Sequence, residues 1–124
     1  MRRFFQGRKS GEDAETRAQQ YLEQQGLRTL QRNYLCRAGE IDIIMQHRDT
    51  LVFVEVRYRK QSRFGSAAES ITTTKQKKII RAANHYLNRE KRHDTPCRFD
   101  VVTLTGAQVE QIEWISDAFQ LELV

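Results

Sequence analysis

Two runs of alternating side chains around a short polar turn constrain the fold more than any other feature of this sequence. In residues 40–46 and again in residues 51–58, an aliphatic side chain or Met occupies every second position. Successive side chains of a strand point to opposite faces of a sheet, so a period of two predicts a strand. Residues 47–50 between the runs are polar and few, and the two runs therefore predict a β-hairpin.

A two-residue turn at Arg48-Asp49 would fix the register of this hairpin. Aliphatic residues then face one another on one side, in the pairs Ile41 with Val56, Ile43 with Val54 and Met45 with Val52. On the other side Asp42 faces Glu55, and Glu40 faces Arg57. A slip by one residue would mix apolar and charged residues on both faces. The turn lacks the preferred Gly, and a longer turn would keep the same facing.

Two carboxylates opposed across a sheet repel each other. At roughly 5 Å, with an effective dielectric constant near 20, the repulsion is about 3 kcal/mol. Protonation of one carboxyl, a cation between the two, or rotation of both into water would relieve it. Mg²⁺ binds one or two carboxylates together with waters and phosphate oxygens. Asp42 and Glu55 therefore form either a Mg²⁺ or Mn²⁺ site or the exposed face of a hairpin, with Glu40 and Arg57 as an ordinary ion pair.

Positive charge is concentrated in one segment of the chain. The whole chain has a net charge of +5, but residues 57–92 carry eleven Lys and Arg against Glu69 and Glu90, a net +9 that leaves −4 elsewhere. Such asymmetry is expected of a surface that binds phosphates. We expect contacts with nucleic acid from Arg59, Lys60, Lys75, Lys77, Lys78 and Arg81. The alternative is a solvated, lysine-rich helix.

The rest of the chain predicts two helices and three more strands. Residues 1–10 are basic and aperiodic and are expected to form a flexible arm. A helix follows from an N-cap at Ser10 to an end near Gly26, with an apolar stripe formed by Ala14, Ala18, Tyr21 and Leu22. A second helix is expected from residues 72–74 to about Asn88, with Ile79, Ile80, Ala83 and Leu87 toward the core. Further strands are expected near residues 27–34, 98–104 and 109–115.

The length of 124 residues suits one domain and has no room for a second. We expect a single α/β domain over residues 11–119, followed by a tail over residues 120–124. The apolar runs are far shorter than the roughly 20 residues of a membrane span, and the N-terminus lacks the apolar stretch of a signal peptide. These observations predict a cytoplasmic protein that does not bind membranes.

Several motifs together resemble the bacterial YraN-like family. They are Gly39-Glu40-Ile41-Asp42-Ile43-Ile44, Val52-Phe53-Val54-Glu55-Val56-Arg57-Tyr58-Arg59, Glu15-x-x-Ala18-x-x-Tyr21-Leu22, Phe64-Gly65, Lys75-Gln76 and Arg98-Phe99-Asp100-Val101-Val102. The resemblance covers nearly all of residues 11–119. The family is similar to the PD-(D/E)xK nucleases, close to the archaeal Holliday-junction resolvases. This similarity implies a restriction-endonuclease-like mixed β-sheet flanked by two main helices.

The resemblance also implies roles for individual residues. Asp42 would be the central ligand of Mg²⁺ or Mn²⁺, and Glu55 would be the second. Glu15 would match an additional acidic residue of the resolvase-like branch. Lys75 and Gln76 would begin the basic helix that contacts nucleic acid.

Arg57 departs from the motif, because it stands where these nucleases carry a lysine. Arginine stays charged in proteins and cannot act as a base. It can hold a phosphate or stabilise the charge of the transition state. The nucleophile would then have to be activated as a metal-bound water alone, or by Lys60 or Lys75.

Three functions follow from these features. The first is a metal-dependent endonuclease that acts on structured DNA. The second is a non-catalytic nucleic-acid-binding protein on a nuclease scaffold, and the third is a protein-interaction subunit whose basic face docks an acidic partner. A symmetric substrate such as a four-way junction would suit a homodimer.

Overall fold

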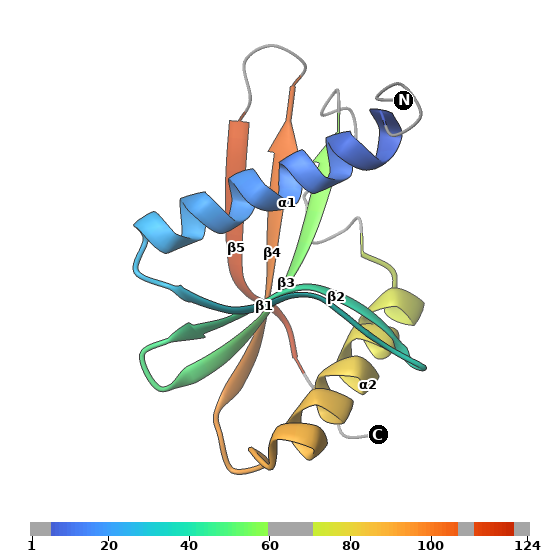
Figure 1. The fold of residues 1–124 in the computed structure, drawn as a ribbon, viewed down its shortest axis with the longest axis vertical. Helices are drawn as coiled ribbons and strands as arrows, with labels where there is room; N and C mark the ends of the chain where they lie inside the picture. The colour runs from blue at the N-terminus through green and yellow to red at the C-terminus, as the bar shows by residue number, and fades with distance from the viewer. Residues whose placement is uncertain (1–5, 60–70, 107–110, 121–124) are drawn as a thin grey trace.

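A computed structural model describes residues 6–59, 71–106 and 111–120 of the chain (Figure 1). The elements are α1 (Gln6–Gln24), β1 (Arg28–Cys36), β2 (Gly39–His47), β3 (Thr50–Arg59), α2 (Thr73–Glu90), β4 (Cys97–Thr105) and β5 (Gln111–Phe119). The strands form one sheet in the order β1-β2-β3-β4-β5. β3 and β4 are parallel, with α2 between them in sequence, and the other neighbours are antiparallel. The predicted α/β fold is confirmed, and the mixed sheet with two helices is consistent with a restriction-endonuclease-like scaffold.

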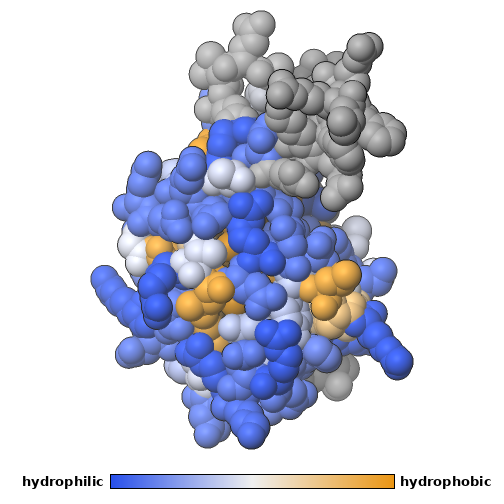
Figure 2. Space-filling view, in the orientation of Figure 1, coloured by the Kyte–Doolittle hydropathy of each residue, from blue (hydrophilic) through white to orange (hydrophobic). Residues whose placement is uncertain are grey.

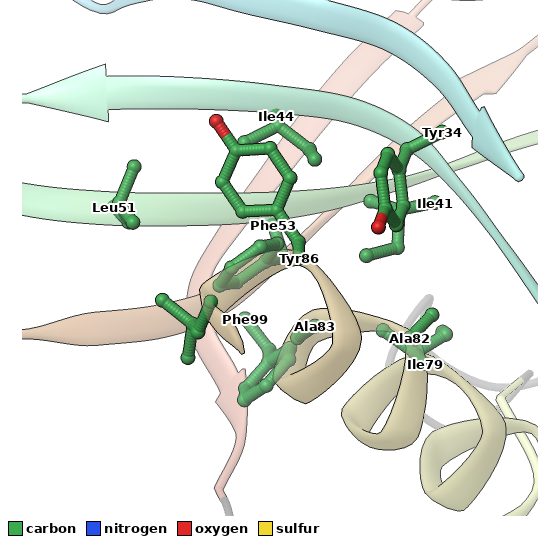
Figure 3. Close-up of a cluster of buried hydrophobic side chains, with 11 residues drawn as sticks. Tyr34, Ile41, Ile44, Leu51, Phe53, Ile79, Ala82, Ala83, Tyr86 and Phe99 are labelled. Atoms are coloured by element: carbon green, nitrogen blue, oxygen red, sulfur yellow. The ribbon is translucent and has the colours of Figure 1, made fainter. Parts of the chain in front are cut away.

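The central strands are buried on both faces. On one face the aliphatic residues of β2 and β3 pack against Ala14, Ala18 and Leu22 of α1. On the other face Ile44 and Phe53 pack against buried residues of α2, among them Tyr86 (Figure 3). A strand buried on both faces needs apolar side chains at consecutive positions. This explains the continuous apolar stretches in the middle of β2 and β3.

The helix boundaries agree with the sequence at α2 and differ at α1. Thr72 caps α2, and its Oγ1 accepts a hydrogen bond of 3.1 Å from the backbone N–H of Lys75. α1 begins at Gln6, so the predicted N-cap Ser10 lies within the helix and residues 6–10, expected in the arm, are helical. Once the buried part of a helix has formed, each further residue adds a backbone hydrogen bond without needing an apolar stripe. Neither described helix has an apolar stretch long enough to cross a membrane.

The hairpin has the predicted register near its turn and departs from it farther away. Ile43 pairs with Val54, and the ladder continues to the turn at Arg48-Asp49. The described ladder ends at Ile43, so the expected pairs of Asp42 with Glu55, Ile41 with Val56 and Glu40 with Arg57 are not formed. Ile41 packs with Tyr34 in the cluster beneath α2, whereas Ile43 faces α1. β2 therefore crosses from one face to the other at Asp42.

The matching change of face in β1 occurs at Asn33. Arg32 pairs with Ile43 and Tyr34 pairs with Ile41, and Asn33 between them has a left-handed backbone with φ of 52°. Asn adopts this conformation more readily than most residues. The alternation rule failed here because burying Ile41 and Tyr34 against α2 favours this bend over a regular ladder.

The far side of the sheet is held by a fully buried carboxylate. Asp100 in β4 accepts hydrogen bonds from Arg98 Nε at 3.0 Å, Trp114 Nε1 at 3.0 Å and the backbone N–H of Asp117 at 2.9 Å. These donors anchor β5 where its pairing with β4 shifts. Trp114 is partly buried and packs against Tyr21 of α1.

Candidate metal and nucleic-acid site

Asp42 lies where β2 separates from β3. Its Oδ2 accepts a hydrogen bond of 2.8 Å from the backbone N–H of Val56. In a continued ladder, that N–H would face the backbone of Ile41 on β2. The carboxyl of Asp42 thus satisfies a strand N–H that the bend leaves without its ladder partner. This contact fixes the side chain at the junction of the two strands.

Glu55 is a buried acid between two cations. It has 5% of its surface exposed and lies on the face of β3 that packs against α2. Arg57 Nη1 and Lys75 Nζ each lie 3.7 Å from Glu55 Oε2. Arg57 is two positions farther along the same strand, and Lys75 belongs to the first turn of α2. Strand alternation and the start of the helix therefore bring both cations to one carboxylate.

Asp42 and Glu55 share a hydrogen bond between their side chains. Burial, followed by the charge of Glu55, raises the pKa of Asp42 to about 8, against a lowering by the Val56 N–H. Burial also raises the pKa of Glu55, although Lys75, the Asp42 hydrogen bond and Arg57 lower it. At neutral pH the Asp42 carboxyl therefore keeps its proton and donates it to Glu55. Protonation relieves the repulsion that the sequence predicted.

Glu15 of α1 is held beside this pair by two residues of β1. Its Oε1 accepts hydrogen bonds from Arg32 Nη2 at 3.1 Å and Asn33 Nδ2 at 2.9 Å. The charge of Glu15 contributes to the raised pKa of Asp42. The structure thus brings Glu15 near the acidic pair. Sequence reasoning missed Arg32 and Asn33, because the bend that turns both side chains toward α1 has no signal in the hydrophobic pattern.

One side of α2 borders the acidic pair. Lys75 and Lys78 are three residues apart and therefore lie on the same side of the helix. Lys75 contacts Glu55, and Lys78 lies against the tip of the β1–β2 hairpin, where a Cβ added to Gly39 would be 3.6 Å from Lys78 Cβ. Lys77 and Arg81 are exposed on α2.

The other predicted nucleic-acid contacts are dispersed. Gln76 donates a hydrogen bond of 3.1 Å to the carbonyl of Ile71, and with Lys77 it lines a separate cavity beside the end of β5. Arg59 lies at the end of β3, where its carbonyl accepts a bond of 3.0 Å from the N–H of Gly106. Lys60 lies outside the described residues. The described contacts therefore come from different elements of the structure.

The carboxyl oxygens of Asp42 and Glu55 suit a divalent cation that takes only some of its ligands from the protein. In residues 6–59, 71–106 and 111–120, no three His, Cys, Asp or Glu side chains come together as a metal-binding group. The carboxyls of Asp42 and Glu55 interact with each other, and a cation held between them would take the place of the proton. Mg²⁺ commonly takes one or two carboxylates and fills its other positions with waters and phosphate oxygens. The pair fits that chemistry.

Residues 14–104 match the uncharacterised protein family UPF0102. The chain belongs to this family. UPF0102 proteins from Nitrosococcus oceani and Saccharophagus degradans are 53% and 55% identical to it, over 93% and 90% of this chain and 94% and 93% of theirs. UPF0102 protein NE0719 from Nitrosomonas europaea is 54% identical over 88% of this chain and 92% of its own. UPF0102 is the YraN-like family that the sequence motifs predicted, so that prediction is confirmed. The matched range contains Glu15, the acidic pair and Lys75.

Proposed function

We propose that this UPF0102 protein is a divalent-metal-dependent endonuclease that hydrolyses phosphodiester bonds in structured DNA. The observation that carries the proposal is the hydrogen-bonded pair of Asp42 and Glu55, with Arg57 and Lys75 each 3.7 Å from Glu55. Paired carboxylates hold a cation, and adjacent cations attract the anionic backbone of a nucleic acid. The resemblance of the sequence to the PD-(D/E)xK nucleases supports the same assignment.

The acidic pair would hold Mg²⁺ or Mn²⁺. When bound, such a cation lowers the pKa of a coordinated water and polarises a phosphoryl oxygen. Asp42 is oriented for this role by the Val56 N–H, and Glu55 by its position between the two cations. Glu15 adds negative charge near the pair while Arg32 and Asn33 hold its side chain.

Arg57 and Lys75 would act on the phosphate. Arg57 presents a planar set of donors that can grip two phosphate oxygens, and it remains charged throughout. Lys75 comes from a different element, so it can approach the same phosphate from the α2 side. Phosphates farther along the strand would contact Lys78, Lys77 and Arg81 of α2, Arg59 at the end of β3, and Lys60, which follows it in the sequence. These contacts position the backbone without reading its sequence.

A non-catalytic nucleic-acid-binding protein is the second candidate, and Arg57 is the observation that favours it. The arginine cannot serve as a base, and with Lys75 it already compensates the charge of Glu55 without a metal. Such a protein would bind DNA through the same basic residues. It would differ from the nuclease only in lacking metal-dependent cleavage.

The test is cleavage of a panel of end-labelled DNA substrates in Mg²⁺ and in Mn²⁺. The panel contains continuous duplex, flapped duplex, a three-way junction and a four-way junction. We expect the parent protein to cut at least one branched substrate and both Asp42→Asn and Glu55→Gln to lose at least 100-fold in rate. Glu113→Gln, which removes an exposed acid from β5, is the matched control and should cut like the parent. Binding without cleavage by the parent would favour the second candidate.

A further inference from the structure

Leu35 of β1 is the large hydrophobic residue that the described part of the chain leaves exposed, with 75% of its surface accessible. It pairs with Glu40 near the tip of the β1–β2 hairpin. Its neighbour Tyr34 is buried under α2, so strand alternation turns Leu35 outward. Single exposed hydrophobic residues are common on proteins. The position of Leu35 on the hairpin indicates a more specific role for this side chain.

Leu35 lies close to the proposed reaction centre. Its partner Glu40 is two residues from Asp42 along β2, a distance of about 7 Å at the usual rise of a strand. The hairpin tip also contacts α2, because Gly39 lies against Lys78. A strand of DNA that placed a phosphate at Asp42 and further phosphates along α2 would therefore pass the tip.

The hairpin tip that carries Leu35 lies near cationic side chains, because Arg37 is part of the tip and Lys78 lies against Gly39. Arg37 at the tip is exposed, as are Lys77, Lys78 and Arg81 on α2, whereas Glu40 is the exposed acid of the tip. Residues 73–81 of α2 contain four cations and no acid. Figure 2 shows a largely hydrophilic surface on which hydrophobic groups form only small, separate patches. An exposed apolar side chain on a hairpin tip that also carries or contacts cations suits a polyanion with an apolar interior, and DNA has both properties.

We propose that Leu35 is an apolar wedge that inserts between bases at an unstacked step beside the cleavage site. The inference rests on the proposed function and names its substrate class, which is duplex DNA interrupted by a branch, flap or mismatch. Arg37 and the cations of α2 hold the phosphates on either side, while Leu35 contacts the exposed base faces. Insertion into a continuous duplex requires unstacking of an intact step, which has an energetic cost. At a branch point part of that cost is already met, so the wedge favours such substrates.

The test measures binding in EDTA, so that no substrate is cut. Flapped and continuous duplexes of the same length carry 2-aminopurine, whose fluorescence rises on unstacking, at the branch point or at the matching position. We expect the parent protein to bind the flapped duplex about tenfold more tightly and to raise its fluorescence. Leu35→Ala and Leu35→Ser should remove most of this preference and the fluorescence change. Both variants should keep their affinity for continuous duplex within about twofold.

Arg37→Gln is the matched control from the same hairpin tip. It should weaken binding to both duplexes by the same factor, because a phosphate contact carries no information about branching. Preference retained by both Leu35 variants would overturn the wedge. Sedimentation that shows Leu35→Ser converting a dimer into a monomer would also overturn it, by assigning Leu35 to self-association. Failure of the parent to bind any DNA would overturn the proposed function itself, whereas DNA binding without preference would overturn only the wedge.

Discussion

Replacing Asp42 with Asn removes one carboxyl of the acidic pair while keeping the shape of the side chain. The amide oxygen can still accept the hydrogen bond from the Val56 N–H, and the amide nitrogen can still donate to Glu55. The substitution therefore preserves the contacts of the protonated Asp42. What it abolishes is the titration of that residue.

The size of the effect follows from the pKa of Asp42, which is about 8 in the folded protein. An unfolded aspartate has a pKa near 3.9, so between these values the folded parent holds a proton that the unfolded chain has lost. A raised pKa contributes stability at low pH that is lost as the pH rises toward 8. The loss is at most about 1.4 kcal/mol per pH unit for one proton. Asp42→Asn has no such loss, so its stability relative to the parent should rise by up to about 4 kcal/mol between pH 5 and pH 8.

Urea denaturation of both proteins at pH 5, 6, 7 and 8 measures this difference. The single tryptophan, Trp114, reports unfolding by its fluorescence, since it is packed on Tyr21 and bonded to Asp100 in the folded state. His47 is present in both proteins and the groups that shift its pKa do not include Asp42, so its contribution cancels. A difference that does not change with pH would refute the reasoning. So would a variant that is less stable than the parent at pH 8.

Three further predictions concern the surroundings of the pair. Substitution of Lys77, Lys78 and Arg81 by Gln should weaken binding to any DNA sequence. It should also reduce the steepness of log affinity against log salt by about 3, measured by fluorescence anisotropy. An unchanged slope would show that these side chains are solvated and do not contact DNA. Arg57→Lys should reduce DNA affinity several-fold, because lysine loses the two-pronged grip, and faster cleavage by this variant would instead show that Arg57 replaces a missing base. In Glu15→Gln the loss of stability with rising pH should be complete at a lower pH than in the parent, since the charge of Glu15 raises the pKa of Asp42. The same pH dependence of urea denaturation in both proteins would show that Glu15 does not act on the pair.

The sequence predicted the elements well wherever burial repeats regularly. The alternation in β2 and β3 predicted their turn and their register from Ile43 to the turn, and α2 begins within the range predicted for it. Periodicity was sufficient in these places because one repeating hydrophobic pattern decided the local structure.

The bend at Asn33 and Asp42 was beyond such reasoning. It replaces a regular ladder with a side-chain bond to the Val56 N–H, and it moves Ile41 to the α2 face. The change depends on packing between segments far apart in sequence, which no local pattern reports. The same bend brings Arg32 and Asn33 to Glu15. The parts of the site that the sequence missed therefore all derive from one tertiary feature.

The most direct test of the central claim is calorimetric titration of the protein with Mn²⁺ at pH 7, in buffers of different ionisation enthalpy. If the pair exchanges its shared proton for a cation, the parent should bind one Mn²⁺ and release about one proton per ion. Glu113→Gln should behave like the parent, whereas Asp42→Asn and Glu55→Gln should bind at least tenfold more weakly. Equal Mn²⁺ affinity in the parent and Asp42→Asn, or no binding by the parent, would contradict the assignment of this acidic pair as a metal site.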